Sequence, residues 1–341
     1  ESAPVLAISK TIAEVTGCTP DTIPPEVLAS TEPLVLKGLA ADWPITRLGL
    51  ESPQKAADYL LQFYQDKPVT AAVGEPDTQG RVFYNEDFSG FNFQSYTVSL
   101  KELLKRVFQH ADDPKPPMIY MASTMIDRWL PGFRQDNDLS IADTQPLASI
   151  WMGNKTRIAA HYDLPDNIAC SVVGRRRFTL FPPDQLANLY PGPLDWAPGG
   201  QSISLVDFHN PDYELHPKFR QAVASAQVAE LAPGDAIFIP SMWWHHVEGL
   251  EAFNVLVNYW WRQSPAFMGP PINALQHALM TVRDLPPEQK KVWQGLFEHY
   301  VFNDDAEAHA YIPEQGLGPL APMDEAQVRK LRSLLLNKLN R

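Results

Sequence analysis

Residues 151–182 read WMGNKTRIAAHYDLPDNIACSVVGRRRFTLFP, and this stretch decides the fold. Within it, the triplet His161-Tyr162-Asp163 follows a run of mostly apolar residues. On an extended strand, side chains point to opposite faces in turn, so His161 and Asp163 share one face. An imidazole nitrogen and a carboxylate oxygen can therefore point at a single metal ion.

A second stretch, residues 234–248, reads GDAIFIPSMWWHHVE and offers a third ligand, either His245 or His246. Two histidines and one carboxylate occupy three sites of an octahedral metal and leave three open, the arrangement found in non-haem Fe(II) oxygenases. A His-x-Asp triplet alone is a weak signal, because it is easily met by chance and usually marks a surface turn. Combined with an aromatic-rich strand that ends in two histidines, it predicts an open metal site.

Shorter motifs accompany these stretches in a fixed order. They are Gly174, Leu180-Phe181-Pro182-Pro183-Asp184-Gln185, Leu189-Tyr190-Pro191, Val206-Asp207-Phe208, Asn210-Pro211-Asp212-Tyr213, Pro233-Gly234-Asp235, Ile239-Pro240, Trp243-Trp244-His245-His246 and Val257-Asn258. From about residue 120 to residue 260 the chain resembles the cupin-like JmjC oxygenases, most closely the asparaginyl hydroxylase that inhibits hypoxia-inducible factor. The resemblance implies a double-stranded β-helix, a jelly-roll of mainly β structure with flanking helices.

The resemblance also implies a ligand set and cofactors. The family's third ligand directly follows an Ile-Pro-x-x-aromatic-aromatic run, which assigns the metal ligands and catalytic residues to His161, Asp163 and His245. His246 then faces the opposite way, by the alternation of a strand. Members of the family use Fe(II), O2 and the cosubstrate 2-oxoglutarate to hydroxylate C–H bonds, and some are demethylases.

The far carboxylate of 2-oxoglutarate needs a fixed cation, and a guanidinium offers a two-pronged donor. Arg176 stands where the asparaginyl hydroxylase has a lysine, so we expect it to bind this carboxylate. Arg175 and Arg177 then face the other way and are exposed or paired. Further cosubstrate contacts implied by the resemblance are Tyr120, Asn167 and Asn258, with Thr156 replacing a family threonine that is Ile158 here. The alternative for the asparagines is an ordinary structural role in the barrel.

The substrate side departs from that relative. Ser202-Ile203 replaces the Arg-Gln pair that binds the target asparagine there. A site without those buried hydrogen-bond donors cannot bind the same side-chain amide in that way. Trp151 and Trp260 are candidates for lining the mouth of the pocket. The insertion at residues 184–233 is expected to face the substrate, because long loops in compact domains are usually functional. We expect structural or surface roles for the other histidines, His110, His209, His216, His277, His299 and His309.

The composition is that of a folded enzyme. The 341-residue chain is 45% hydrophobic, and its 32 prolines suit short strands joined by turns. A net charge of -12 argues against a general affinity for nucleic acid or for membranes. Two cysteines provide no disulfide framework, and there is no apolar run of membrane-spanning length and no signal-peptide pattern. We therefore expect a cytoplasmic protein.

Three segments are expected along the chain. Residues 1–115 form an α/β segment that packs on the barrel, with helices starting at Ser52-Pro53 and Ser99. Residues 116–265 form the barrel, and its clearest strands are 118–121, 149–152, 168–173, 177–181, 236–239 and 253–260. Residues 266–341 are helical, and the helix that starts near Asp324 carries too much leucine for a fully exposed helix. Packing within the chain would cover it. The resemblance implies a homodimer through these C-terminal helices instead.

The combined prediction is an Fe(II)- and 2-oxoglutarate-dependent dioxygenase that hydroxylates a protein or peptide side chain. A small molecule or a modified tRNA base is the alternative substrate, and the acidic charge counts against tRNA. A different class of protein would be a cupin whose metal binds or isomerises a substrate without oxygen chemistry. Such cupins usually employ more histidines together with a glutamate. An interaction module that kept only the fold is a third interpretation.

Overall fold

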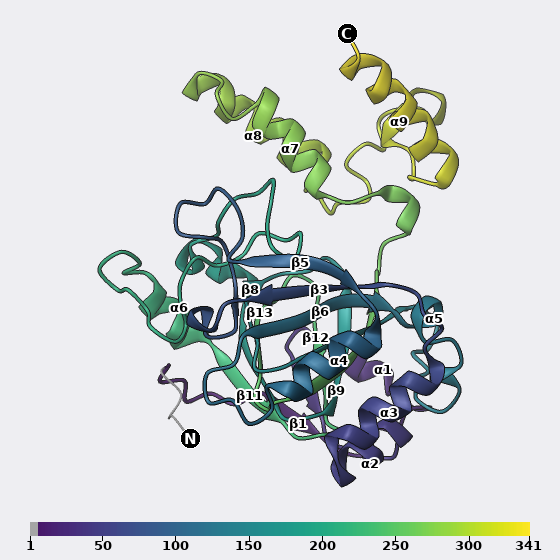
Figure 1. Cartoon of the computed structure of the whole chain (residues 1–341). Coiled ribbons are helices and arrows are strands. Elements are labelled where there is room, and N and C mark those ends of the chain that lie inside the picture. Colours follow the sequence, from purple (N-terminus) through teal and green to yellow (C-terminus); the bar gives the residue numbers. More distant parts are fainter. Residues whose placement is uncertain (1–5) are drawn as a thin grey trace. The chain divides into compact units, whose positions relative to one another are not determined.

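A computed structural model of the chain describes residues 6–341 (Figure 1). The chain divides into two compact units, of which the first ends at Trp261 and contains both β-sheets. The second unit, Arg262–Arg341, is helical. None of the helices in the described part combines the length and the apolar character needed to cross a membrane.

The larger sheet has nine strands in the order β1-β2-β12-β9-β14-β7-β6-β3-β5. In that order the strands are β1 (Ala13–Val15), β2 (Leu34–Leu36), β12 (Ala236–Ile239), β9 (Asp166–Val173), β14 (Asn254–Trp261), β7 (Leu147–Gly153), β6 (Met118–Met125), β3 (Val69–Gly74) and β5 (Phe93–Val98). Except for the parallel β1–β2 pair, its neighbours are antiparallel. The segment before the barrel therefore extends the larger sheet at both of its edges.

The smaller sheet has five strands in the order β11-β10-β13-β8-β4. They are β11 (Gln227–Leu231), β10 (Arg176–Phe181), β13 (Trp244–Gly249), β8 (Arg157–His161) and β4 (Arg81–Val82). Strands β10 and β9 are joined through Gly174, whose φ is +78° and where an added Cβ would lie 2.3 Å from Oδ1 of Asn254. The two packed sheets form the predicted jelly-roll, mainly β with flanking helices.

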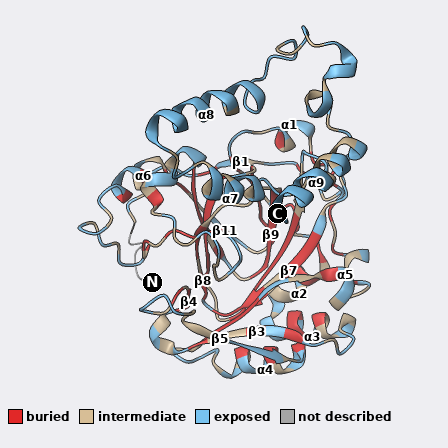
Figure 2. Cartoon of the chain, turned by 90° about the horizontal axis from the view of Figure 1, so that it is seen from above, coloured by how far each residue is buried: buried red, intermediate tan, exposed pale blue. Residues whose placement is uncertain are grey.

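Alternation along the strands sorts side chains into two cores. Between the sheets, Ala169 of β9 and Leu256 of β14 pack with Phe178 of β10. On the other face of the larger sheet, their neighbours Cys170 and Val257 pack toward the helices. Figure 2 shows most residues of the central strands as buried, whereas the connecting loops are largely exposed. Side chains two residues apart on these strands therefore share either the space between the sheets or the helical side.

Short helices accompany the first unit, and α2 to α5 contribute to the core on the outer face of the larger sheet. They are α1 (Pro25–Leu28), α2 (Pro44–Glu51), α3 (Pro53–Phe63), α4 (Leu100–Gln109), α5 (Ile126–Trp129) and α6 (Phe219–Ser225). The predicted helix starts are confirmed, because the Ser52 hydroxyl accepts from the Lys55 amide and the Ser99 hydroxyl accepts from the Glu102 amide. These caps satisfy amides that the first turn of a helix leaves without partners.

The second unit contains α7 (Ile272–Thr281), α8 (Pro287–Tyr300) and α9 (Glu325–Leu339). Helix α9 begins after Asp324, as predicted, and the Asp324 carboxylate accepts from the Gln327 amide. Four of its leucines are exposed: Leu334, Leu335, Leu336 and Leu339 are 43–54% exposed, whereas Leu331 is half-buried. Apolar residues of α7 and α8 are exposed as well, among them Met280 and Trp293.

Candidate metal centre and cavity

Two histidines are brought together by the pairing of β8 with β13. In this antiparallel pair His161 and His245 lie directly opposite each other, and their ring centroids are 4.3 Å apart. The two residues are 84 positions apart in the chain, so only the strand pairing makes them neighbours. Both side chains point into the space between the sheets, where they line a common cavity.

Asp163 completes the group, although it lies outside the strand. Strand β8 ends at His161, so the alternation expected to place His161 and Asp163 on one face does not extend to Asp163. The chain turns after His161, and the amide of Met242 donates to the carbonyl of Asp163 at 2.9 Å. Oδ2 of Asp163 lies 3.2 Å from Nε2 of His245 and 3.8 Å from Nε2 of His161. One ligand atom from each residue falls within 4.8 Å of the others, a spacing that can hold a metal ion.

Hydrogen bonds orient both imidazoles. Nδ1 of His161 lies 2.9 Å from the carbonyl of Ala159, and Nδ1 of His245 lies 2.9 Å from the carbonyl of Trp243. A carbonyl only accepts, so each Nδ1 donates its proton there, and Nε2 is the nitrogen that faces Asp163 and offers a lone pair to a metal when it carries no proton. This is the usual way in which proteins fix the tautomer of a metal-binding histidine.

The electrostatics of the group also suit a cation. Burial and the neighbouring His245 lower the pKa of His161, so its imidazole is neutral at pH 7. Burial alone would raise the pKa of Asp163, but the hydrogen bond with His245 and the two nearby imidazoles lower it to about 2. A carboxylate and two neutral imidazoles are the protonation states that bind a metal.

A single cation lies in the same cavity. Arg176 is 4% exposed and points from β10 into the space between the sheets. Within residues 6–341 no carboxylate pairs with it, and its Nε has no hydrogen-bond partner. Burial lowers its pKa to about 10, so it is charged at neutral pH. Its neighbours Arg175 and Arg177 face outward and pair with Glu230, as the alternation predicted.

A buried and unpaired guanidinium is costly unless an anion binds to it. Tyr120 lines the cavity beside Arg176 and is almost fully buried; burial raises the pKa of its hydroxyl, so this group stays a hydrogen-bond donor. The residues therefore fit a metal ion at the histidines and Asp163, together with a carboxylate near Arg176 and Tyr120. Two charged sites in one cavity match a small acid that chelates the metal through its other end.

The cavity has a volume of about 360 Å³. Of the residues singled out in the sequence, those that line it are His161, Asp163, His245, Arg176, Tyr120, Asn167, Asn258, Trp151 and Trp260. The indole N–H of Trp151 donates to Asn258 at 2.7 Å, and the amide of Asn258 donates to Asn167 at 3.2 Å. The Trp151 and Trp260 rings pack edge to face, with centroids 5.8 Å apart. These contacts give the asparagines a structural role on the wall of the cavity.

Thr156 is not brought to this cavity. It is 3% exposed, and its backbone carbonyl accepts from the amide of Gly249 in the bend before β8. Ile158 lines the cavity instead, so the wall there is apolar. The hydrogen bond that Thr156 was expected to supply to the cosubstrate is therefore not supported by its position.

Further residues that the sequence analysis did not assign to the pocket also line the cavity. From the insertion, Pro198, Gly199, Gln201 and Ile203 line the cavity, in agreement with the expectation that the insertion faces it. The other walls add Val82, Phe178, Ser123, Ile239 and Leu256. The inward position of Phe178 and Leu256 follows from strand alternation, whereas the insertion residues carry no such periodic signal.

The comparisons with known proteins agree with this geometry. A family model described as a cupin-like domain matches residues 20–267, well over half of the chain. The chain belongs to the cupin-like domain family. Its relatives include proteins named as JmjC-domain proteins and as demethylases, so the coarser part of the predicted resemblance is confirmed.

Three relatives show how far the similarity extends. The chain is 25% identical over 307 residues to tRNA wybutosine-synthesizing protein 5 of Gallus gallus, covering 82% of this chain and 90% of that protein. It is 33% identical over 164 residues to lysine-specific demethylase JMJ31 of Arabidopsis thaliana, covering 45% of this chain and only 29% of that protein. It is 25% identical over 242 residues to Jumonji C domain-containing protein 5 of Drosophila melanogaster, covering 67% and 54% respectively.

Proposed function

We propose that this cupin-like protein is an Fe(II)- and 2-oxoglutarate-dependent dioxygenase that hydroxylates a C–H bond. The observation that carries the proposal is one cavity that combines an open set of two histidines and a carboxylate with a buried, unpaired Arg176. Iron and 2-oxoglutarate, when bound, supply the oxygen chemistry: the substrate C–H becomes C–OH, and 2-oxoglutarate and O2 become succinate and carbon dioxide.

The chain's own residues bind, orient and exclude water. His161, Asp163 and His245 would hold the iron through three ligand atoms and leave the rest of its coordination sphere free. Arg176 would bind the far carboxylate of 2-oxoglutarate, with the Tyr120 hydroxyl as a second donor. Apolar residues such as Ile158, Val82 and Leu256 keep the space between these two anchors dry.

The charges in the cavity narrow the substrate class. Among the residues that line it, Tyr120 and Arg176 are the ionisable side chains outside the metal-binding group. Once the cosubstrate's carboxylate binds Arg176, no lining side chain remains to pair with a charge on the substrate. Burying an unpaired charge is expensive. We therefore infer that the group presented to the iron is neutral, such as an uncharged side chain of a protein or peptide, and we favour hydroxylation over demethylation of a methylated lysine.

The finer resemblance to an asparaginyl hydroxylase does not by itself supply a substrate. Ser202 directs its hydroxyl to the carbonyl of Gly192 at 3.1 Å, and Ile203 is an apolar wall residue. Ser202 does not line the cavity and the Ile203 side chain has no polar group, so neither side chain is placed to bind the side-chain amide of a substrate there. Specificity for asparagine would need hydrogen-bond donors from other residues of the cavity wall. Gln201, which directly precedes Ser202 and lines the cavity, is a candidate.

A modified tRNA base is the second candidate substrate. It is favoured by the similarity to tRNA wybutosine-synthesizing protein 5 of Gallus gallus, which aligns along most of both chains. The net charge of -12 opposes binding to a polyanion. Adding total tRNA to the turnover assay described below distinguishes this substrate from a peptide.

We also propose that the protein is a homodimer through α7, α8 and α9. The support is the set of exposed apolar side chains on these helices, including Met280, Trp293 and the four exposed leucines of α9. Monomeric proteins rarely expose contiguous apolar patches of this kind. A cytoplasmic location remains a proposal that rests on the cysteine content and the composition of the chain.

Succinate formation tests the oxygenase. Protein loaded anaerobically with Fe(II) and 2-oxoglutarate is exposed to O2, and succinate is measured with and without peptide libraries, metabolites or tRNA. We expect slow succinate release without substrate and faster release with the correct one. Asp163→Asn, which removes a ligand charge, is expected to abolish both, and Arg175→Gln on the outer face serves as the matched control.

Two outcomes would overturn the proposal. Metal binding without any succinate, coupled or uncoupled, would indicate a cupin that uses its metal for other chemistry. Absence of metal binding at His161, Asp163 and His245 would indicate an interaction module that has kept only the fold.

A further inference from the structure

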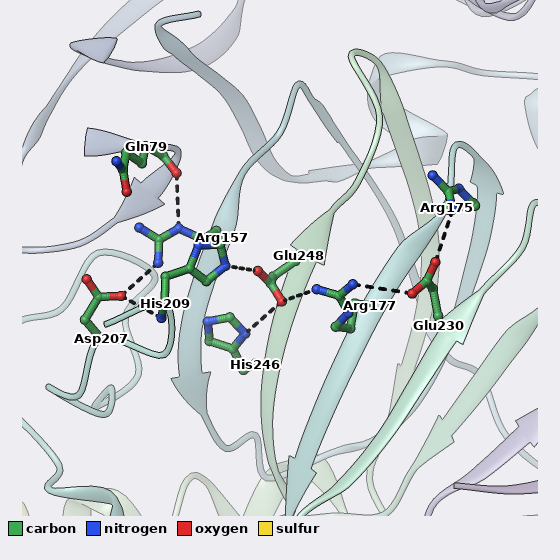
Figure 3. Close-up of polar contacts among 9 residues, drawn as sticks. All are labelled: Gln79, Arg157, Arg175, Arg177, Asp207, His209, Glu230, His246 and Glu248. Carbon is green, nitrogen blue, oxygen red and sulfur yellow. Dashed lines mark hydrogen bonds and ion pairs between the residues drawn. The ribbon is translucent and has the colours of Figure 1, made fainter. Parts of the chain in front are cut away.

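The outer face of the smaller sheet carries a continuous line of charged side chains (Figure 3). On β13, strand alternation puts Glu248 on this face, opposite the face that presents His245. On β8, Arg157 is an even number of residues from His161, and it reaches the outer face because the pairing of β8 with β13 shifts register by one residue between His161 and Ile158. Asp207 and His209, from the insertion, reach the same face and contact them. We call Arg157, Asp207, His209 and Glu248 the outer-face cluster.

Arg157 is the most enclosed member of the cluster, with 6% of its side chain exposed. It donates to Oδ1 of Asp207 at 2.9 Å and to the backbone carbonyl of Gln79 at 3.1 Å. Arg81 adds a second cation 3.8 Å from the Asp207 carboxylate. Burial would raise the pKa of Asp207, but the two guanidiniums lower it, so the carboxylate is charged.

Glu248 is the second attachment point. Its carboxylate accepts a hydrogen bond from Nε2 of His209 and lies 3.5 Å from Arg177. Asp207 in turn accepts from the backbone amide of His209 at 3.0 Å, so the two insertion residues are joined to each other. A single short segment of the insertion is thereby bound to both strands that carry the metal-binding histidines.

The same segment forms a wall of the cavity a few residues earlier. The amide of Ser204 donates to the carbonyl of Ala160 at 2.8 Å, beside His161. Ile203 is 5% exposed and lines the cavity, followed toward the N-terminus by Gln201, Gly199 and Pro198. Residues 198–209 therefore run from the cavity wall on one side of the smaller sheet to the outer-face cluster on the other.

We propose that Asp207 and His209 are positioning residues that hold residues 198–203 at the substrate side of the cavity. The inference rests on the proposed function only in naming this wall the substrate side. The physical reason is that a buried ion pair tolerates few arrangements: Arg157 has one carboxylate partner, and losing it would leave a guanidinium uncompensated. The Arg157–Asp207 ion pair thus fixes where residues 198–209 attach to the smaller sheet. Ile203 in the cavity wall is only four residues away from Asp207, so its position is fixed as well.

A spin label on the wall tests the proposal without a substrate. Gln201→Cys places one exposed thiol there, and the chain's own Cys18 and Cys170 are 8% and 0% exposed, so labelling is selective. The label's mobility and the affinity for Mn(II) are measured in the labelled protein and in labelled Asp207→Asn and His209→Gln. Arg175→Gln is the control, because it breaks ion pairs with Glu230 and Glu251, which do not belong to the outer-face cluster.

We expect the label's rotational correlation time to shorten by roughly twofold in Asp207→Asn, and by less in His209→Gln, as the wall loses its attachment at the outer-face cluster. The Mn(II) dissociation constant should not change in either variant, and Arg175→Gln should leave both readouts unaltered. Mn(II) binding by itself keeps this test separate from the turnover test of the proposed function.

Three results would overturn the proposal. The first is an unchanged label in Asp207→Asn. The second is a loss of Mn(II) affinity together with the increased mobility of the label, which would mean that the cluster positions the metal-binding strands instead. The third is an equal effect of Arg175→Gln, which would mean that any ion pair on this face acts alike. If Asp207→Asn does not fold, the label's mobility in His209→Gln tests the proposal instead. The His209 side chain is 42% exposed, so its replacement disturbs less of the core.

Discussion

At the scale of single residues, Arg176 gives the clearest indication of an anionic ligand. Its charge is buried without a counter-ion, whereas Arg175 and Arg177 on either side are paired at the surface. Three consecutive arginines thus have two different roles, and the direction of each side chain decides which. The arrangement stores an unfavourable interaction in the unliganded protein that an anionic ligand would relieve.

Replacing Arg176 by methionine should have opposite effects on stability and on binding. We expect the free energy of unfolding of the unliganded protein to rise by about 1 to 3 kcal/mol, because an unpaired buried charge is removed. We expect affinity for 2-oxoglutarate to fall about tenfold to a hundredfold, the usual contribution of hydrogen bonds between charged groups. Chemical denaturation measures the first quantity, and calorimetry with Mn(II)-loaded protein measures the second.

Arg175→Met is the matched control for that experiment. The Arg175 side chain is 44% exposed and points away from the cavity, so its loss should leave 2-oxoglutarate affinity unchanged. Equal affinity for 2-oxoglutarate in the Arg176→Met variant and in the unaltered protein would show that the acid does not bind at this guanidinium.

Glu248 should make stability depend on pH in the acid range. Burial would raise its pKa, but the hydrogen bond from His209 and the neighbouring positive charges lower it from 4.5 to about 2. A carboxyl group with a depressed folded-state pKa stabilises fully above its unfolded pKa and loses this contribution as the pH falls. Glu248→Gln should therefore lower stability at pH 7 by about 2 kcal/mol and flatten the loss of stability between about pH 5 and about pH 2.

Urea denaturation at a series of pH values checks this prediction. Glu251→Gln is a suitable comparison, because the side chain of Glu251 is 41% exposed and pairs with Arg175 at the surface. Exposed pairs contribute little. An acid-range slope that is the same in Glu248→Gln and in the unaltered protein would contradict the prediction.

At the scale of elements, strand alternation explains which side chains face the cavity. On β13, His245 and Val247 point inward, while Trp244, His246 and Glu248 point outward. His246 stacks on Phe208 at 4.3 Å, so it is part of the outer core and not a ligand. The choice between His245 and His246 therefore follows from a single register, which one residue of slip would reverse.

The turn between β9 and β10 depends on Gly174. An added Cβ would lie 2.3 Å from Asn254 on a backbone with φ of +78°, so we expect Gly174→Ala to destabilise the protein by more than about 2 kcal/mol. Gly295→Ala is the control, because Gly295 lies in α8 with nothing within 4 Å of an added Cβ. There the same substitution should stabilise by about 0.5 to 1 kcal/mol. Thermal unfolding measures the melting temperature of both variants. Changes of the same sign in the two variants would contradict the prediction.

At the scale of the whole molecule, exposed apolar side chains concentrate in the second unit. Leu335 and Leu339 lie on α9 with 43% and 52% of their surfaces exposed. If these helices form the proposed homodimer, Leu335→Glu combined with Leu339→Glu should convert the protein to a monomer, because burying two carboxylates in an apolar interface is unfavourable. Light scattering coupled to size exclusion measures the mass directly.

Leu50→Glu is the control, since Leu50 is 64% exposed on α2 in the first unit. That variant should keep the mass of the unaltered protein. A monomeric unaltered protein, or a double variant that remains a dimer, would refute dimerisation through α9.

What the sequence by itself determined are the features that depend on neighbours along the chain. The helix starts at Ser52, Ser99 and Asp324 follow from capping groups within three residues of the amides they satisfy. The inward direction of Arg176 and the outward direction of its neighbours follow from the period of a strand. The resemblance carried by the motifs also predicted the jelly-roll and the cupin-like family.

Only the tertiary structure decided which distant residues meet. It ended β8 at His161 and brought Asp163 to His245 by a turn, where alternation alone had been expected to do so. It left Thr156 outside the cavity, and it joined Asp207 and His209 to strands far away in the chain. The physical reason is that local preferences act over a few residues, whereas these contacts depend on strand register and on how loops pack after the sheets have formed.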